Sequence, residues 1–399
     1  MAHHRVTGGG NGIRQRGVSR GLVFVLLAIV LIAAVIVAWQ QLGDHLDRQA
    51  DNAAASCIEG PATVDVVADA DVAPALMAIA REYAASKPVV RDHCITIAVR
   101  AGDAKTTLDG LAGRWDTGPM GAFPAAWIPQ SSVWAAELAQ AKPSSLEGTP
   151  SSLVTSPVVL ATSTELGKTL DGKLDWAQVP TLQQRDDSLR DFDISGWGSL
   201  RMAMPLGAQS DASSLAAQAV AMRVMRTSSA LTREDASSSR VSSSVSAMLD
   251  GAPQSPDGTP TGAATVMRDA GDARTSPIHA VPITEQQLYT LTREDTTARL
   301  AEIVPTGPTP LADYPVIRLS GDQISPVASA AVAEFFTFAQ DPKHLSLLTS
   351  QGFRGNAPLP PATKTVGFPI TKEPMPQPES SAIVTINKLV YGRDFGPAS

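Results

Sequence analysis

The chain has 399 residues, of which 43% are hydrophobic and 18% charged, so it is long enough for one large two-lobed domain or two ordinary ones and is not a disordered polymer. Its formal net charge of -7 gives no electrostatic support to nucleic-acid binding through phosphate contacts. Two cysteines and six histidines, none at zinc-ligand spacing, exclude a cysteine-rich scaffold, and we expect no structural metal site and no cofactor.

The first predicted element is a membrane span at residues 21–39, where no charged residue interrupts the apolar run. As a helix it would be about 28 Å long, close to the hydrocarbon thickness of a bilayer. Basic residues precede it and acidic residues follow it, which predicts a cytoplasmic tail at 1–20 and an outer stalk at 40–56. The expected location is the cell membrane, crossed once, with the remaining chain extracellular. A cleaved signal peptide is the competing interpretation.

After the stalk, apolar runs of strand length alternate with segments of helical period, which predicts an α/β fold. The first unit is a strand at 63–68, a helix at 73–84 and a second strand at 94–99. The strands of such a unit can lie side by side. Cys57 lies just before the first strand and Cys94 begins the second, so we expect the two cysteines to form a disulfide.

The same alternation continues along the chain, and two segments rich in Gly, Pro and polar residues interrupt it. Residues 250–261 are expected to form a loop. Residues 355–379 begin a Pro-rich C-terminal arm that runs to residue 399, and we expect this stretch to be extended with limited packing. The remaining predicted elements are strands at 123–129, 156–161, 200–205 and 278–283, a strand-like run at 311–319, and helices at 133–141, 212–225, 239–249 and 327–339.

Four stretches of the chain together resemble a known family. They are VDVVADADVAPALMAIAREY from residue 64, PAAWIPQSSVW from residue 124, LRMAMPLGAQSDASSLAAQAV from residue 200, and YPVIRLSGDQISPVASAAVAEFFTFAQDPKHLSLLTSQGF from residue 314. Their order and spacing resemble the type 2 periplasmic solute-binding proteins, most closely the molybdate-binding branch. The resemblance implies a two-lobed α/β domain at 57–354 that holds a solute between its lobes. The first lobe would comprise 57–155 and 284–354, and the second 156–283.

The resemblance also points to polar residues at the ends of strands, where open α/β sheets bind ligands. The candidate ligand-binding residues are Asp69, Asp71, Ser131, Ser132, Ser210 and Ser213. Two of these sets also have a purely structural interpretation. Asp71 could be the N-cap of the helix after the first strand, and the serine pair at 131–132 could cap the helix that follows it. Two carboxylates in the first loop depart from the oxyanion-binding pattern, because they would repel an anion. A cationic, zwitterionic or polyol solute, or none, therefore stays open.

Other side chains give no comparable signal. The usual catalytic motifs are absent from the sequence, the histidines are scattered, and an enzyme is not expected. The stretch from Asp193 to Trp197 resembles a D-x-S-x-S metal site, but Trp197 stands where the second hydroxyl is needed. Tryptophans could stack on a sugar, although burial in the core is the commoner role.

The sequence therefore predicts a membrane-anchored extracellular solute-binding protein that holds a small polar solute for transport or sensing. An ABC permease is the partner that a transport role implies. The alternative is an envelope module that keeps the fold without a solute and binds an envelope protein. Nucleic acid is not an expected partner of either form.

Overall fold

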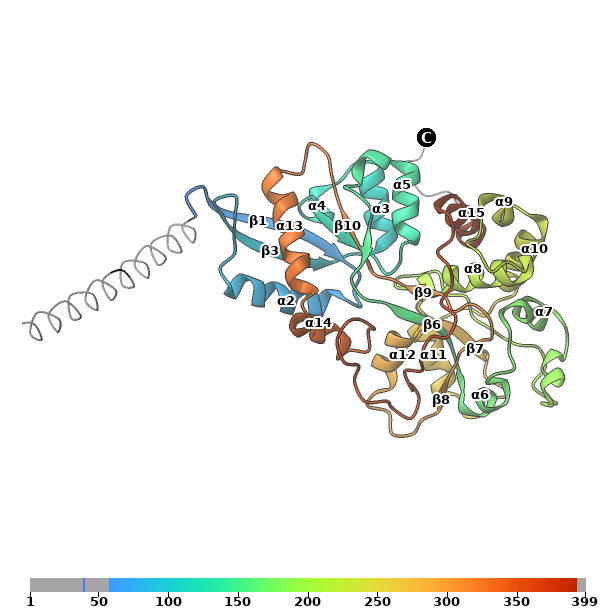
Figure 1. Cartoon of the computed structure of the whole chain (residues 1–399). Coiled ribbons are helices and arrows are strands. Elements are labelled where there is room, and N and C mark those ends of the chain that lie inside the picture. Colours follow the sequence, from blue (N-terminus) through green and yellow to red (C-terminus); the bar gives the residue numbers. More distant parts are fainter. Residues whose placement is uncertain (1–38, 40–56, 393–399) are drawn as a thin grey trace, which may run out of the picture. The chain divides into compact units, whose positions relative to one another are not determined.

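The computed structural model describes residue 39 and residues 57–392 (Figure 1). The described residues from Glu59 on form one compact unit that contains two β-sheets, each with its own helices. The predicted span, tail and stalk lie outside the described residues, apart from Trp39. Among the residues described, none of the helices has both the length and the apolar character to cross a bilayer.

The sheet of the first lobe has the strand order β2-β3-β1-β4-β10-β5. β1 pairs in parallel with β3 on one side and with β4 on the other, whereas β10 runs antiparallel to β4. The predicted strand-helix-strand unit is confirmed, and its two strands are neighbours as expected. The strands are β1 (Gly60–Ala68), β2 (Val89–Val90), β3 (His93–Ala101), β4 (Ala126–Ile128), β5 (Ser151–Ser152) and β10 (Pro315–Arg318).

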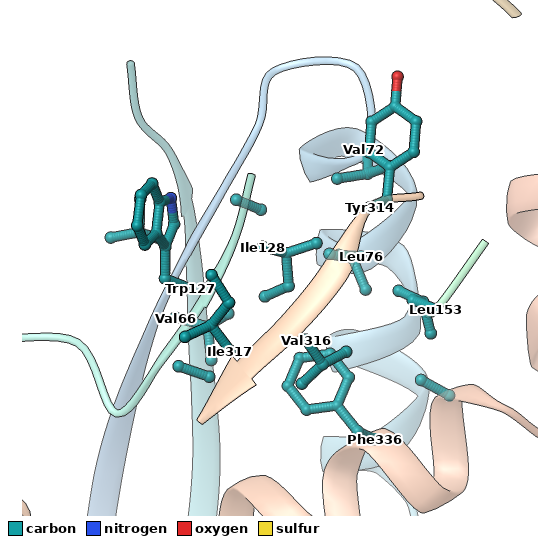
Figure 2. Close-up of a cluster of buried hydrophobic side chains, with 14 of the residues drawn as sticks. Val66, Val72, Leu76, Trp127, Ile128, Leu153, Tyr314, Val316, Ile317 and Phe336 are labelled. Carbon is teal, nitrogen blue, oxygen red and sulfur yellow. The ribbon is translucent and has the colours of Figure 1, made fainter. Parts of the chain in front are cut away.

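The longer helices of the first lobe cover this sheet through apolar faces. Leu76 and Ile79 of the helix after β1 are fully buried, as its helical period predicts (Figure 2 shows Leu76 in this core). Tyr83 packs edge to face against Phe335 and Phe338. The helices are α2 (Ala73–Ala85), α3 (Ala104–Ala112), α4 (Thr117–Met120), α5 (Val133–Ala141), α13 (Pro326–Ala339) and α14 (Pro342–Thr349), with a 3-10 turn η1 (Pro143–Ser145).

The second lobe is built around β6 (Ser156–Ser163), an apolar strand that is buried almost throughout. β6 pairs antiparallel with β7 (Ala280–Thr284), β8 (Leu300–Ile303) and β9 (Leu311–Ala312). Its helices are α6 (Thr164–Leu170), α7 (Val179–Gln184), α8 (Asp211–Met225), α9 (Arg233–Ala236), α10 (Ser239–Leu249), α11 (Pro260–Asp269) and α12 (Glu285–Thr292), with 3-10 turns η2 (Trp176–Gln178) and η3 (Ser188–Phe192).

Two expectations for the second lobe need correction. The predicted return to the first lobe at residue 284 is too early, because β8 still pairs with β6 and the chain rejoins the first sheet only at β10. The strand predicted at 200–205 is wrong, since only an isolated bridge joins Met202 to Ala280. Pro205 has no N–H to continue such a ladder, and the chain turns away into the loop before α8.

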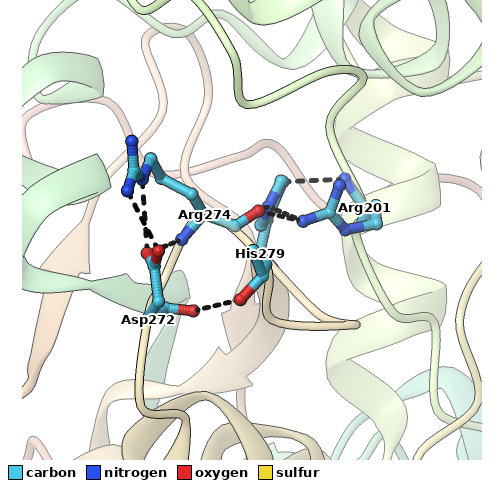
Figure 3. Close-up of polar contacts among 5 residues, drawn as sticks. Arg201, Asp272, Arg274 and His279 are labelled. Carbon is cyan, nitrogen blue, oxygen red and sulfur yellow. Dashed lines mark hydrogen bonds and ion pairs between the residues drawn. The ribbon is translucent and has the colours of Figure 1, made fainter.

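Arg201 holds two loops of the second lobe together (Figure 3). Its guanidinium donates to the carbonyl oxygens of Ser276 at 2.9 Å and Arg274 at 2.6 Å, and it contacts the ring of His279. Burial, followed by the charge of Arg201, lowers the pKa of His279 to about 4, so this ring is neutral at physiological pH. These contacts give His279 and Arg201 a structural role in this lobe.

Both cysteines are oxidised, and the predicted disulfide between Cys57 and Cys94 is confirmed. The C-terminal segment departs from expectation. Its described part includes α15 (Ser380–Tyr391), which packs against α5 of the first lobe and against α8, α9 and α10 of the second (Figure 1). Ile383 and Ile386 are buried there because this helix carries an apolar face. The expectation of limited packing therefore does not hold for α15.

Candidate functional site

Three loops meet between the lobes. The loop after β1 carries Asp69 and Asp71, the loop after β4 carries Gln130 and the serine pair at 131–132, and the loop before α8 comes from the second lobe. The N–H of Asp69 donates to the carbonyl of Ile128 at 2.7 Å, which fixes the first two loops side by side. The parallel pairing of β1 and β4 places both strand ends at one edge of the sheet, where α/β proteins bind ligands.

The carboxylate of Asp71 is the centre of this site. Its Oδ2 accepts from Gln130 Nε2 at 3.0 Å and from the hydroxyl of Tyr314 at 3.1 Å, both in the first lobe. The same oxygen accepts from Gln287 Nε2 at 3.0 Å, and Oδ1 accepts from Gln209 Nε2 at 2.9 Å, both in the second lobe. One side chain thus receives four donors, two from each lobe. We call these five side chains the interlobe clasp.

Backbone groups fix the direction of two of the three amides in the clasp. The Oε1 of Gln130 accepts from the N–H of Asp211 at 2.9 Å, so its Nε2 faces Asp71. The Oε1 of Gln287 accepts from the N–H of Thr284 in a capping box at the start of α12. Both amides therefore present donors, and not acceptors, to the space that Asp71 fills.

The backbone at the clasp is strained at two donors. Gln209 has a φ of 54° and Tyr314 a φ of 36°, both in the left-handed region that non-glycine residues rarely adopt. Such conformations persist where the surrounding structure holds them, and they concentrate at functional sites. Tyr314 is fully buried and belongs to the first-lobe core, which also contains Val72 (Figure 2).

Burial shifts the acidity of the carboxyls around the clasp. Burial raises the pKa of Asp71 to about 6, although the hydrogen bonds from Gln130, Tyr314 and the other donors oppose this. Asp69 is more deeply buried, and burial together with the charge of Asp71 raises its pKa well above the ordinary value. The Oδ1 of Asp69 accepts from the N–H of Asp71 at 2.9 Å, which shapes the loop.

Asp211, at the start of α8, makes a second set of contacts between the lobes. Its Oδ2 accepts from the hydroxyl of Ser131 at 2.7 Å and from the indole N–H of Trp134 at 2.8 Å. Burial raises the pKa of Asp211 to about 6. Trp134 is fully buried, which agrees with a packing role, and so are Trp127 and Trp176.

The helix-cap interpretation is wrong for Asp71 and holds only in position for the serine pair. The N-cap of α2 is Val72, whereas Ser132 does stand at the N-cap of α5, but neither N-cap residue makes a side-chain capping hydrogen bond. Ser132 instead donates to Asp313 through its hydroxyl and, at 2.6 Å, through its N–H. The carboxylate of Asp71, in turn, accepts from the four donor side chains of the clasp.

The two serines of the second lobe are turned inward. The hydroxyl of Ser210 donates to the carbonyl of Gly207 at 2.5 Å, within its own loop. Ser213 is fully buried inside α8, and its hydroxyl has no hydrogen-bond partner among the described residues. A ligand-binding role for these serines stays a prediction.

Two cavities flank the clasp. One of about 570 Å³ is lined on the first lobe by Ala70, Asp71, Pro74 and Gln351, and on the second by side chains that include Gln286 and Thr290. The other, of about 200 Å³, lies between Asp69, the start of α3, and Gln209. Ala70 borders both cavities, so the loop after β1 separates them.

A larger cavity of about 680 Å³ lies away from the clasp, where residues 363–373 pass the end of β8. Its wall contains the fully buried Glu285, which binds Arg354 through two hydrogen bonds of 2.8 and 2.6 Å. Burial and the neighbouring Glu285 raise the pKa of Glu302 to about 8, so this carboxyl is mainly protonated at neutral pH.

None of the four residues that donate to Asp71 was predicted from the sequence as a site residue. The capping box of Thr284 and Gln287 is a local signal that could have identified Gln287. Gln130 directly precedes the predicted serine pair, but nothing local distinguishes its amide from any other. Gln209 and Tyr314 come together with them only through the fold.

Comparisons with known proteins agree with this architecture. Two uncharacterized proteins of Mycobacterium tuberculosis, from strains CDC 1551 and H37Rv, are each 34% identical over 401 residues. The alignment covers all of this chain, and the chain spans 57% of the length of these relatives.

Solved structures share the fold at low sequence identity. A ferric binding protein from Campylobacter jejuni is 11% identical with a TM-score of 0.55, over 82% of this chain and 97% of that one. Iron-bound HitA from Pseudomonas aeruginosa is 12% identical with a TM-score of 0.54, over 83% and 98%. The periplasmic binding protein AfuA from Actinobacillus pleuropneumoniae, with bound fructose-6-phosphate, is 11% identical with a TM-score of 0.51, over 84% and 97%.

These likenesses confirm the two-lobed α/β fold of periplasmic binding proteins. The profile of one family, described as bacterial extracellular solute-binding protein, matches residues 64–354. This range covers both sheets and every residue of the clasp. The chain therefore belongs to the bacterial extracellular solute-binding protein family, as its resemblance predicted.

Proposed function

We propose that this protein is a membrane-anchored extracellular solute-binding protein that holds a small polar solute between its lobes. The observation that carries the proposal is the interlobe site, where polar side chains of both lobes converge beside a cavity of about 570 Å³. A cavity of this volume is within the range of small-molecule sites. Its lining combines Asp71 with Gln286, Gln287, Thr290 and Arg293, which suits a polar solute.

Anchoring and location are part of the proposal and rest on the sequence. The apolar run at 21–39 follows four arginines and precedes three aspartates, which favours an N-terminus in the cytoplasm and the lobes outside the cell. A solute-binding protein held at the membrane is suited to deliver its solute to an ABC permease or to report its presence to another envelope protein.

A second candidate is an envelope interaction module that keeps this fold and binds no free solute. Its support is that the lobes are already joined by contacts within the chain, at Asp71 and at Asp211. The C-terminal helix α15 adds a further connection, because Asn387 donates to Glu137 of α5 at 2.9 Å and accepts from Ser214 of α8. A partner protein would then bind the outer surface.

Thermal-shift screening of the full chain in detergent separates the two candidates. Amino acids, sugars, sugar phosphates, polyols and oxyanions form the panel. A solute that binds the folded protein should add about 2.7 kcal/mol at a hundredfold excess over its dissociation constant. Substitution of Gln287 by leucine, which alters the cavity wall, should reduce that gain. No response to any member of the panel would contradict the solute-binding proposal and favour the interaction module.

A further inference from the structure

We infer that the interlobe clasp is a carboxylate-binding site whose resident ligand is the side chain of Asp71. The inference deepens the proposed function, and rests on it, by naming the chemistry of the ligand that this site takes. Asp71 belongs to the first lobe, yet two of its four donors come from the second. Its carboxylate therefore joins the two lobes by accepting hydrogen bonds from both, as the acid group of a bound solute would.

The donor set defines this chemistry. A carboxylate has two oxygens that only accept hydrogen bonds, and here they receive three amide N–H groups and one phenol hydroxyl. Because backbone N–H groups hold the oxygens of Gln130 and Gln287, these two amides cannot turn to present acceptors without breaking those bonds. The site is consequently selective for an acceptor group with two oxygens.

The connection to the chain makes Asp71 hard to displace. A tethered group competes with a free one at a high effective concentration, because binding costs it little translational freedom. A simple monocarboxylate in solution therefore does not replace Asp71. A solute that enters the unchanged protein through its acid group must also gain contacts in the neighbouring cavity, where Thr261, Gln286, Thr290 and Arg293 lie.

The test replaces Asp71 by smaller residues and supplies the missing atoms from solution. Asp71→Ala removes one carboxylate group, which formate restores, whereas Asp71→Gly removes the fragment that acetate restores. The full chain is studied in detergent at pH 7.5, with sodium chloride at matched ionic strength as the salt control. Each variant should melt about 5 °C below the unchanged protein and recover most of this loss with its own fragment.

Two variants serve as controls. Asp71→Asn fills the same volume but presents an amide N–H₂ to the donors, so it should melt lower and not respond to formate. Asp272→Ala removes an exposed carboxylate of the second lobe that pairs with Arg274, and it should respond to neither anion. The unchanged protein should also show no response to formate or acetate beyond that to sodium chloride.

The inference fails if the alanine and glycine variants fold, as circular dichroism would show, and neither gains stability from its fragment. It also fails if formate or acetate stabilises Asp71→Asn or Asp272→Ala as much as it stabilises the alanine and glycine variants of Asp71. Recovery of both small-residue variants, with no solute found for the unchanged chain, supports this inference and contradicts the proposed function. The two claims can therefore be overturned separately.

Discussion

Gln130 shows how a single amide sets the electrostatics between the lobes. It is fully buried, its oxygen is held by the N–H of Asp211, and its N–H₂ faces Asp71. An acid at this position would keep the first bond and place a second carboxyl against Asp71. Like charges at this distance cannot both ionise without a large cost.

We therefore predict that Gln130→Glu lowers the free energy of unfolding by about 3 kcal/mol at pH 7.5. The loss should shrink near pH 5, where one proton shared between the two carboxyls removes the repulsion. Urea unfolding at the two pH values measures both quantities. Gln254→Glu, at an exposed amide of the second lobe, is the matched control and should change stability little at either pH.

The buried carboxyls predict an unusual pH dependence of stability. The pKa of Asp71 and that of Asp211 are each raised to about 6, above the ordinary value of 3.8. Between these values the folded protein binds more protons than the unfolded chain, so its stability falls as pH rises from about 4 to about 6. Lys105, which lies near Asp211, opposes the shift there, whereas Asp313 adds to it.

Asp211→Asn removes one of these titrations. We expect the decline in unfolding free energy between pH 4 and 6 to become shallower by about 3 kcal/mol, because a neutral amide does not ionise. Thermal or urea unfolding across this range provides the measurement. A profile as steep as that of the unchanged protein would show that Asp211 keeps an ordinary pKa in the folded state.

Residue-level prediction from sequence succeeded in part. The position of Asp71 in a loop at the end of the first strand was predictable, since it follows from the strand pattern. Its partners were not, because Gln130, Gln209 and Tyr314 are distant in sequence and have no local signature. The cap interpretation failed for a physical reason: four side-chain donors in a buried site compete successfully with the free N–H groups at the start of α2.

At the scale of elements, periodic helices were predicted most reliably. Helices α5 and α10 have the bounds that their patterns indicated, because each carries a buried apolar face. The short helices α6, α7 and α12 were missed, because six to eight residues span too few turns to show a helical period. In α12, moreover, most of the buried side chains are polar, so the sequence gives no apolar stripe. The strand at 200–205 was wrong because an apolar run can be buried beside β7 without forming a ladder.

The C-terminal helix is the element whose role was least predictable. It joins the lobes through the fully buried Asn387. Asn387→Ala removes a donor to Glu137 and an acceptor for Ser214, so we predict a loss of about 2 kcal/mol in unfolding free energy. Urea unfolding measures it. If the exposed control Gln254→Ala lost as much, the helix would not contribute as described.

The disulfide supports the start of the first sheet. It links Cys57, just before β1, to Cys94 at the start of β3. Replacement of both cysteines by serine should cost about 3 to 4 kcal/mol, because the unfolded chain is no longer constrained by the closed loop. Urea unfolding measures the loss. The unchanged protein should lose the same unfolding free energy when its disulfide is reduced, whereas reductant should not change the stability of the double variant.

At the scale of the whole molecule, most of the apolar core of each lobe is separate, but the two cores meet where the chain crosses between lobes. Leu160 and Val159 of β6 belong to second-lobe clusters, whereas Val158 of β6 and Ala312 of β9 pack into the first-lobe core. Ala212 and Leu215 of α8 also pack into the first-lobe core, and Asp211 lies directly before them. The division into two lobes follows from sequence pattern, but this shared contact depends on how the lobes meet.

The most direct test of the account measures the distance between the lobes when no solute is present. Spin labels at Arg81→Cys of α2 and Ser243→Cys of α10, both exposed positions, report this distance by electron-electron double resonance. We predict one narrow distribution for the full chain without solute, which broadens to longer distances in Asp71→Ala and narrows again with formate. A broad distribution or a long mean distance in the unchanged chain, which does not change when Asp71 is replaced by alanine, would contradict the account.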